Sequence, residues 1–391
     1  MKPGRDEIAV VGAGIGGLTA ALALIRAGFS VRIYEQATTL GEVGAGITLS
    51  PNASRVLDHL GLGAGLRAIG YTPPLQRIRH FATGETLVET PRGDLPERTY
   101  GAGYYHVHRA DLHDLLSAAV RAADPDAIVL GAKLCAIETP DARPTLVFAT
   151  GERVPADLVI GADGVRSAVR AALFETTPPH FTGHVAWRAI VPREALTPDV
   201  ADAPPGIHIG PGKLFLRYPV RHGAFVNYAA FAREDGWVNE SWSARASVAD
   251  AEDAFAGWDR LALDVIRATP PDGCYKWALF ARDPLPCWSV GRVTLLGDAA
   301  HAMLPFMGQG AAMAIEDGMV LARCIAASDG PDEAIARYAA ARRDHATMVQ
   351  SASRALGDRL ESAHPERYGA GGHQNEETMG LFAYDAVTTP I

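Results

Sequence analysis

Three glycines near the start of the chain have the spacing of a phosphate-binding turn. Gly12, Gly14 and Gly17 form the pattern G-x-G-x-x-G directly after the apolar run IAVV, and residues 14–27 are apolar at helical spacing. In such a turn the first glycine permits a tight bend, the second lets backbone approach a pyrophosphate, and the third lets helix pack on strand. Unpaired N–H groups at the helix start favour an anion. We therefore expect these glycines and the adjacent Ile15 to contact a nucleotide.

An acidic residue follows where a dinucleotide requires one. Residues 30–34 predict a second strand, which closes a βαβ unit, and Glu35 ends that strand. A carboxylate there accepts hydrogen bonds from ribose hydroxyls and repels a 2′-phosphate. Glu35 and the neighbouring Gln36 are thus expected cofactor contacts. These residues favour a dinucleotide without distinguishing FAD from NAD.

Two later segments choose the flavin by resemblance. They are DLVIGADGVRSAVR (157–170) and GRVTLLGDAAHAMLPFMGQGAAMAIEDG (291–318). They resemble the second and third fingerprints of the FAD-dependent aromatic hydroxylases, which are class A flavoprotein monooxygenases. The resemblance implies that Asp298 holds the ribityl chain of FAD and that Asp163 braces the pyrophosphate region. It also implies that Pro305 lies beside the reactive edge of the flavin, with Gly308 in contact with the cofactor.

The resemblance covers nearly the whole chain and is nearest to the salicylate, 3-hydroxybenzoate and 6-hydroxynicotinate hydroxylases. Arg109, in the stretch HVHRADLHDLL, matches the family arginine that begins a helix and contacts FAD. Leu134 matches a main-chain contact to the cofactor, and Thr48 is expected beside it. The implied cofactor is FAD, with NADH or NADPH as cosubstrate.

The activity that the resemblance implies is hydroxylation of a small aromatic or heteroaromatic acid or phenol, with or without decarboxylation. Reduced flavin traps O₂ as a C4a-hydroperoxide, and the protein must keep that group dry and hold an electron-rich ring within its reach. Transfer goes fastest to a phenolate. Relatives therefore place a base beside the substrate hydroxyl.

Three positions depart from the relatives' bases. Leu214 stands where the 3-hydroxybenzoate and 6-hydroxynicotinate enzymes have a histidine, Thr48 replaces another histidine of the 6-hydroxynicotinate enzymes, and Phe306 replaces one of the salicylate enzymes. Tyr218 matches the site tyrosine and, with Pro305, is expected at the reacting centre. Either the substrate is acidic or electron-rich by itself, or His208, Tyr218 or another group is the base.

Two arginines are candidates for holding a substrate carboxylate. Arg188 and Arg217 lie beside aromatic residues in expected strands, and a guanidinium can bind a carboxylate through two parallel hydrogen bonds. His208 and Phe306 are further candidate substrate contacts. The competing interpretations are surface positions for the two arginines and His208, and a core position for Tyr218.

Composition excludes several other functions. The 391 residues carry a formal net charge of -9, so the chain lacks the basic balance of a non-specific nucleic-acid binder. The N-terminus has no leader pattern and no segment predicts a membrane span. The four cysteines are far apart without a CxxC pair, so neither a disulfide framework nor a metal site is expected. We expect a cytoplasmic monomer or homodimer whose partners are a small aromatic substrate and O₂.

The order of the segments predicts an α/β fold. A discontinuous, Rossmann-like FAD-binding domain is expected over residues 1–173 and 285–330, because the nucleotide motifs lie in both ranges. Residues 174–284 carry alternating runs such as KLFLRYPV, which predict a mostly antiparallel β-sheet substrate domain. Residues 331–391 are expected to form C-terminal helices and a tail.

Two other functions compete with hydroxylation. The lost histidines suggest a related flavoprotein that epoxidises or reduces a non-aromatic substrate. A non-catalytic protein that keeps FAD as a structural or sensing ligand would also carry these motifs.

Overall fold

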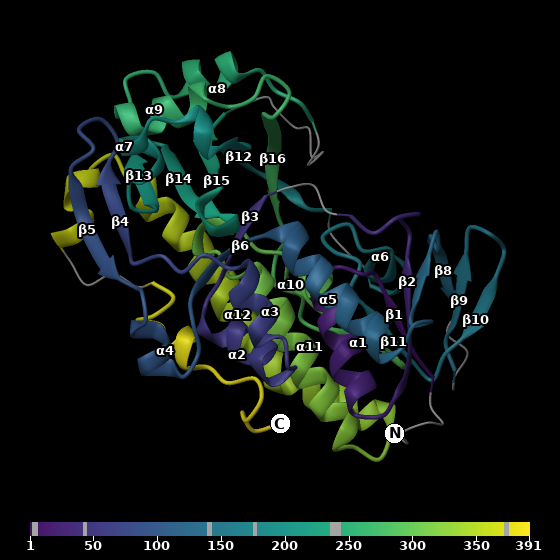
Figure 1. Cartoon of the computed structure of the whole chain (residues 1–391). Helices are drawn as coiled ribbons and strands as arrows, with labels where there is room; N and C mark the ends of the chain where they lie inside the picture. The colour runs from purple at the N-terminus through teal and green to yellow at the C-terminus, as the bar shows by residue number, and fades with distance from the viewer. Residues whose placement is uncertain (2–6, 42–44, 139–142, 175–177, 235–243, 371–374) are drawn as a thin grey trace.

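A six-stranded sheet and a seven-stranded sheet lie at opposite ends of the molecule, with long helices between and beside them (Figure 1). The computed structural model describes the whole chain except residues 2–6, 42–44, 139–142, 175–177, 235–243 and 371–374. The α/β fold expected from the order of the segments is confirmed.

The six-stranded sheet contains the first strand of the chain and two strands from distant segments. Its order is β17 (Ser289–Val290), β18 (Val293–Leu295), β11 (Leu158–Gly161), β1 (Glu7–Val11), β2 (Ser30–Glu35) and β7 (Ile128–Leu130). Every neighbouring pair is parallel except β17 with β18. The central strands are buried on both faces, which explains why they read as continuous apolar runs.

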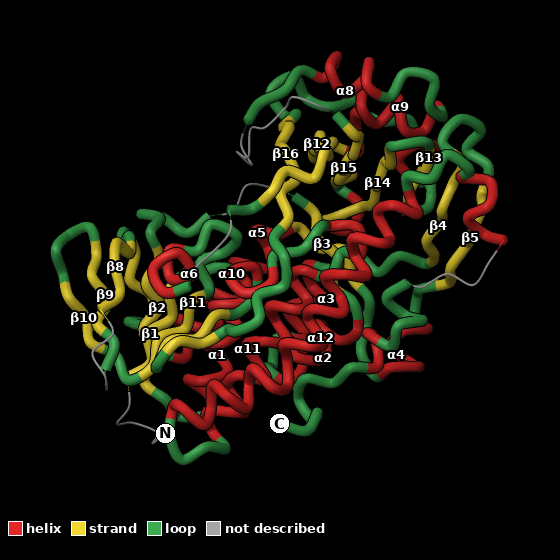
Figure 2. The backbone as a smooth tube through the Cα atoms, turned by 180° about the vertical axis from the view of Figure 1, so that it is seen from behind, coloured by secondary structure: helices red, strands yellow, loops and turns green. Residues whose placement is uncertain are grey.

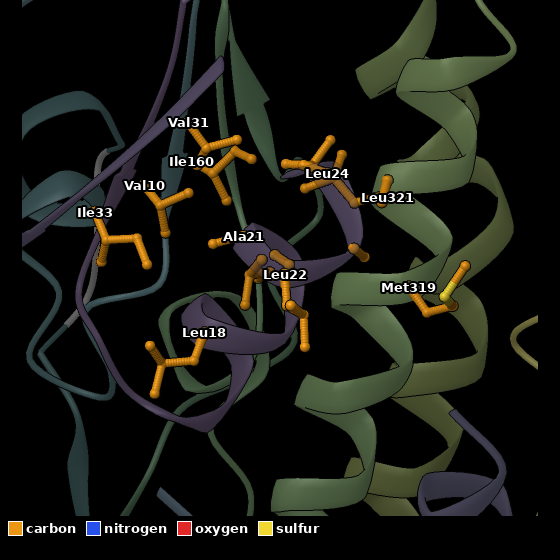
Figure 3. Packing of buried hydrophobic residues seen from close by; sticks show 14 of the residues in the cluster. Val10, Leu18, Ala21, Leu22, Leu24, Val31, Ile33, Ile160, Met319 and Leu321 are labelled. Atoms are coloured by element: carbon orange, nitrogen blue, oxygen red, sulfur yellow. The ribbon is translucent and has the colours of Figure 1, made fainter. Parts of the chain in front are cut away.

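Helices cover this sheet: α1 (Ile15–Arg26), α5 (Arg109–Ala123), α6 (Ala168–Leu173), α10 (Asp298–His301) and α11 (Gly310–Ala326). Figure 3 shows α1, with its buried Leu18 and Leu22, between Val10 of the sheet and helix α11. Burying each such leucine stabilises the fold by about 1.5–3 kcal/mol. A Cβ on Gly318 of α11 would lie only 2.8 Å from Ala20 N, so the two helices touch through their backbones.

Two small sheets flank this core. One is antiparallel and consists of β8 (Leu134–Glu138), β9 (Thr145–Phe148) and β10 (Arg153–Pro155). The other is the antiparallel pair β3 (Gly46–Leu49) and β6 (Tyr105–His108). Helices α2 (Pro51–His59), α3 (Gly63–Ile69) and α4 (Leu95–Tyr100) lie near this second pair, which sits between the two large sheets (Figure 1).

The seven-stranded sheet is mixed. Its order is β16 (Tyr275–Ala281), β12 (His180–Pro192), β15 (Phe225–Arg233), β14 (Lys213–Val220), β13 (Gly206–Gly210), β4 (Leu75–His80) and β5 (Thr86–Pro91). Strands β13 and β4 pair in parallel, and the other neighbours are antiparallel. Strands β4 and β5 lie outside residues 174–284. The sequence analysis missed them because these half-buried, charged strands carry little apolar alternation.

The two faces of this sheet pack against different partners. Trp187, Phe215 and Tyr228 face a cluster with helices α7 (Pro198–Ala201), α8 (Val248–Ala254) and α9 (Arg260–Arg267). Leu214 and Phe231 share the cluster on the other face with Phe306. Successive strand residues point to opposite faces, so odd and even positions of β14 have different neighbours.

The C-terminal part begins with the 30-residue helix α12 (Pro331–Leu360), which runs past both large sheets (Figure 2). Residues 375–391 are held against the body. Arg55 donates hydrogen bonds to the carbonyl oxygens of Tyr384 and Phe382, and Arg337 donates to that of Ile391. The end of the chain therefore contributes to the surroundings of α2 and α4.

Candidate active site

The motifs that are far apart in the sequence meet at one edge of the six-stranded sheet. Strands β2, β1, β11 and β18 are consecutive neighbours in that sheet and run in the same direction. Their carboxyl ends therefore lie side by side, and the segments that follow them begin there. Such an edge is where parallel α/β sheets bind ligands.

The glycine turn has the close contacts that its residue types require. Gly12 has φ 103°, and a Cβ on it would lie 2.6 Å from the carbonyl oxygen of Ala162. A Cβ on Gly17 would lie 2.1 Å from the carbonyl oxygen of Gly12, so α1 packs directly on the turn. Gly14 precedes α1, whose first residue is Ile15, and has open space where a Cβ would stand. The helix start thus faces free volume.

Glu35 is held at the same edge by the backbone. Its Oε2 accepts a hydrogen bond of 2.8 Å from Ala13 N, and its Oε1 accepts one of 2.8 Å from Ala37 N. Each carboxylate oxygen keeps a second lone pair that can accept from a hydroxyl. Gln36 follows at the surface.

Helix α5 closes the glycine turn from another side. Its first residue is Arg109, whose backbone N–H donates a hydrogen bond of 2.8 Å to the carbonyl oxygen of Ala45. His113 Nε2 donates to Ala13 O at 2.8 Å, so this helix is fixed directly to the turn. The sequence analysis did not identify His113.

Asp163 connects the second motif to the third. Its carboxylate accepts hydrogen bonds from Ser167 Oγ at 2.5 Å and from Ala168 N at 2.6 Å, which caps α6. Arg170 of that helix donates to the carbonyl oxygens of Ala299 and Ala300 at 3.1 and 3.2 Å. The carboxylate therefore braces the edge through the protein's own backbone.

Asp298 is exposed although the residues around it are buried. It begins α10, while Gly297, Ala299 and Ala300 on either side are buried. Gly297 has φ 59°, which lets the chain turn sharply after β18. A Cβ on Gly310 would lie 4.0 Å from Asp298 Oδ1, so this carboxylate stands beside the start of α11.

A buried ion cluster fixes the Gly297 turn from below. Asp317 Oδ2 accepts hydrogen bonds from Gly297 N at 2.9 Å and from His301 Nε2 at 2.5 Å. Arg342 Nε donates to Asp317 Oδ1 at 2.8 Å, and its Nη1 lies 2.7 Å from Glu316 Oε2. Burial alone would raise the pKa of Asp317, but His301 and Arg342 hold it well below the usual range. Asp317 is therefore ionised across the working pH range.

The same cluster reaches the loop that carries Pro305. Asn52 Nδ2 donates to Glu316 Oε1 at 2.6 Å and to Gln309 Oε1 at 3.1 Å. Gln309 precedes α11 and follows Gly308, whose φ is 65°. The loop between α10 and α11 is thus anchored at both ends, with the short 3₁₀ turn η3 (Pro305–Met307) in its middle.

These groups fit the FAD that the motifs imply. The start of α1 offers N–H groups to a pyrophosphate, and Glu35 offers acceptors to a ribose. Asp298 offers an exposed carboxylate to a sugar-like hydroxyl beside α11, and the positive end of that helix suits the flavin charge that develops on reduction. All of them open on the same edge of the sheet.

The seven-stranded sheet meets the strand pair β3 and β6 at Tyr218. A Cβ on Gly46 would lie 2.5 Å from Tyr218 Cε2 and 2.8 Å from Asn227 Cγ, and Gly46 N donates to Asn227 Oδ1 at 2.7 Å. The ring of Tyr218 lies 4.4 Å from that of His106. Burial, followed by the nearby Tyr104, raises the pKa of Tyr218, which stays a neutral hydroxyl.

Leu214 and Phe306, two of the positions where relatives have a histidine, lie in a buried apolar cluster that we call the apolar wall. Phe306 packs on Phe231 with ring centroids 5.6 Å apart, and Leu214 belongs to the same buried cluster. Thr48 lies near Gly308, whose hypothetical Cβ is 3.9 Å from Thr48 Cβ. The structure therefore places Thr48 near the loop that contains both Pro305 and Phe306.

Arg188 shares the inward face of the seven-stranded sheet. Its guanidinium stands 5.0 Å from the ring centroid of Trp277, a residue of the same cluster as Leu214 and Phe306. Its side chain is buried. A buried guanidinium on this face can meet a ligand carboxylate.

Arg217 and His208 lie on the opposite face. Arg217 donates to the carbonyl oxygens of Val200 and Ala203 at 3.1 and 2.9 Å, which ties α7 to the sheet. His208 Nε2 lies 3.0 Å from Asp259 Oδ2, just before α9. Both contacts hold covering helices, so this placement does not support the substrate contacts expected of the two residues. The sequence offered no signal for which face each would take.

The remaining expected position, Leu134, is buried at the start of β8 and pairs with Phe148. Three polar residues near Tyr218 were not expected from the sequence: His106 lies against the Tyr218 ring, Gln76 contacts His106, and Arg92 contacts Gln76. No sequence signal pointed to them, because contacts between distant strands leave no local pattern.

Two other features are absent from the part of the chain that the structure describes. None of its helices combines the length and the apolar character that a membrane span needs. Nor does any group of three or more histidine, cysteine, aspartate or glutamate side chains there have an arrangement that could hold a metal ion.

Comparisons with known proteins agree with this geometry. The sequence model of the family described as FAD binding domain matches residues 5–353. A 3-amino-4-hydroxybenzoate 2-monooxygenase of Streptomyces platensis is 39% identical over 357 residues, which cover 90% of this chain and 88% of that protein. A 6-hydroxynicotinate 3-monooxygenase of Pseudomonas fluorescens is 36% identical over 395 residues, covering 98% and 96%. A solved salicylate hydroxylase in complex with substrate is similar with TM-score 0.82 and 26% identity, covering 97% and 96%.

Replacing the exposed carboxylate tests its expected contact with the cofactor. Asp298→Ala should weaken FAD binding about tenfold to hundredfold, because a hydrogen bond to a charged group is worth about 1.5–3 kcal/mol. The dissociation constant of FAD is measured by fluorescence titration of the apoprotein. Asp126→Asn, an exposed carboxylate on a loop at the other edge of the sheet, is the control. Equal affinities for the three proteins would remove Asp298 from the site.

Removing the buried arginine tests the ion cluster. Arg342→Met should lower the free energy of unfolding by about 3–5 kcal/mol, since it leaves Glu316 and Asp317 buried without their counter-ion. Urea denaturation gives this quantity. Arg343→Met removes a half-exposed neighbour paired with Asp344 and should change the stability by less than about 1 kcal/mol. A similar loss in both variants would refute the special role of the cluster.

Proposed function

The chain belongs to the FAD binding domain family and is an FAD-dependent monooxygenase, and we propose that it hydroxylates a small aromatic or heteroaromatic acid at the junction of the two large sheets. The expected resemblance to the salicylate, 3-hydroxybenzoate and 6-hydroxynicotinate hydroxylases is confirmed. The observation that carries the proposal is the meeting of Gly12, Glu35 and Asp298 at one sheet edge.

The division of labour within the chain follows from this placement. We assign FAD to residues 1–173 and 285–330, apart from β4 and β5, which belong to the sheet that faces the substrate. Gly12, Gly14, Ile15 and Gly17 would hold the pyrophosphate, Glu35 and Gln36 the adenosine, and Asp298 the ribityl chain. Arg109, Leu134, Asp163, Thr48 and Gly308 would complete the cofactor site.

Bound FAD, reduced by NADH or NADPH, supplies the activation of O₂ for transfer to the ring. The chain's residues keep water out and orient the substrate. The apolar wall excludes water from the reacting groups, and it contains Leu214, Phe231 and Phe306. Tyr218, with its raised pKa, donates a hydrogen bond from a neutral hydroxyl and does not accept a proton.

Arg188 would bind the substrate carboxylate. It is buried on the inward face, and strand β15 alone separates its strand from that of Tyr218. A carboxylate at Arg188 and a ring hydroxyl near Tyr218 would fix the ring at two points. Holding the ring in one orientation next to the flavin lowers the entropic part of the activation barrier.

The reaction is tested on the FAD-loaded protein with NADH or NADPH in air. A panel of hydroxybenzoates, aminohydroxybenzoates and hydroxypyridine carboxylates should contain compounds that accelerate NAD(P)H oxidation. The product should carry one oxygen atom from ¹⁸O₂, measured by mass spectrometry. NAD(P)H oxidation that yields hydrogen peroxide alone with every compound would contradict hydroxylation.

The role of Arg188 is tested with the best acid of that panel. Arg188→Gln should raise its KM about tenfold or more, since a charge-assisted pair to a carboxylate contributes about 1.5–3 kcal/mol. The matched control is the analogue of the same acid without its carboxylate, whose KM should not change. A parallel rise for both compounds would indicate a structural role.

A further inference from the structure

An imidazole stands beside the position where a family histidine is missing. Thr48 of β3 and His106 of β6 are directly paired residues. Directly opposite residues of an antiparallel pair point to the same face, about 4.5–5.5 Å apart. This face also carries Gly46, against which Tyr218 packs. The chain therefore has a histidine, His106 of β6, directly opposite Thr48 of β3.

Three polar side chains determine which nitrogen of His106 carries the proton. Arg92 Nε donates to Gln76 Oε1 at 2.9 Å, and because arginine cannot accept, this contact fixes the orientation of the Gln76 amide. Gln76 Nε2 then donates to Tyr104 OH at 2.9 Å and faces His106 Nε2 at 3.5 Å. An amide N–H requires an acceptor. The neutral imidazole therefore has its lone pair on Nε2 and its proton on Nδ1.

The surroundings keep this imidazole uncharged. Its side chain is 1% exposed and lies between the rings of Tyr218, Tyr104 and Tyr71, with Arg92 as the nearby cation. Burial, followed by the charge of Arg92, lowers the pKa of His106 to about 3. Such a group is too weak a base to take a proton from a phenol, but it remains a hydrogen-bond donor.

The donor on His106 has no partner within the described part of the chain. Its Nδ1 is buried and forms no hydrogen bond to any described residue. A buried donor without a partner costs about 1–3 kcal/mol, so such groups call for an explanation. A ligand oxygen would satisfy it. Because the ring is covered, ligand entry must displace a neighbour, and Tyr218, 4.4 Å away between ring centroids, is the nearest aromatic ring.

We propose that the Nδ1–H of His106 donates a hydrogen bond to the ionised ring oxygen of the substrate, and that this site selects a substrate whose hydroxyl is already acidic. The inference rests on the proposed function. The proton of the hydroxyl is lost to solvent, and His106 and Tyr218 bind the resulting anion as neutral donors. The substrate class is therefore an electron-poor phenolic acid or a hydroxylated heteroaromatic acid. This accounts for the absence of histidines at positions 48, 214 and 306.

The test uses a phenolic acid whose anion is coloured, 4-hydroxy-3-nitrobenzoate, bound to the FAD-loaded protein without NAD(P)H. The fraction of the bound probe that is ionised is read from its absorbance as a function of pH. The wild-type protein should bind the anion preferentially. His106→Asn, which keeps an N–H at the same distance from Cβ, should retain most of this preference. His106→Leu should reduce the ionisation constant of the bound probe about tenfold, a shift of one pKa unit.

A third variant keeps His106 but moves the proton of its neutral imidazole from Nδ1 to Nε2. In Gln76→Glu the carboxylate accepts from His106 Nε2, which moves the lone pair to Nδ1, so the preference for the anion should fall as in His106→Leu. FAD content and circular dichroism confirm folding of each variant. Equal ionisation of the probe in all four proteins, or an equal loss in His106→Asn and His106→Leu, would overturn the proposal. Because no turnover is needed, this result is independent of whether the panel yields a hydroxylated product.

Discussion

The buried charge cluster around Arg342 is the constraint on which the site depends. The guanidinium of Arg342 and the carboxylates of Glu316 and Asp317 are fully buried, and they join α12 to α11. The same carboxylates hold Gly297 and Asn52, from which the Asp298 turn and Gln309 take their positions. Such a cluster stabilises little by itself, because desolvation offsets the attraction. It fixes one geometry, since any other leaves a charge unpaired.

That geometry couples the sheet edge that carries Asp298 to the apolar face of the seven-stranded sheet. The loop after Asp298 passes through Pro305 and Phe306, and Phe306 packs both on Phe231 of the seven-stranded sheet and beside Gly357 of α12. A displacement of α12 would therefore move the apolar wall and the Gly297 turn together. The order of the chain contributes to this coupling. Strands β17 and β18, which follow residue 285, complete the six-stranded sheet, and the Pro305 loop and α11 follow them in the chain.

The polar groups around Tyr218 include two that are neutral. Tyr218 and His106 are both buried, and burial moves the pKa of the tyrosine up and that of the histidine down, so both favour their uncharged forms. Arg92 orients this network through Gln76, and it is itself paired with Glu377 near the end of the chain at 3.0 Å. The C-terminal segment thus helps to position Gln76 of β4 and His106 of β6 through Arg92.

The sequence by itself determined that this protein is an FAD-binding enzyme. The residues expected to hold the cofactor, Gly12, Gly17, Glu35 and Asp298, lie in turns, at strand ends and at helix starts, and these features leave short and readable sequence patterns. It also predicted the class of reaction through three motifs. Only the tertiary structure decided which face of the seven-stranded sheet each candidate substrate residue takes. Whether Arg188, Arg217 or His208 faces the site depends on the face of a strand and on the helices that cover it, and the pairing of Thr48 with His106 joins segments far apart in the chain. Contacts of this kind have no local signature, because they arise only when distant strands pack.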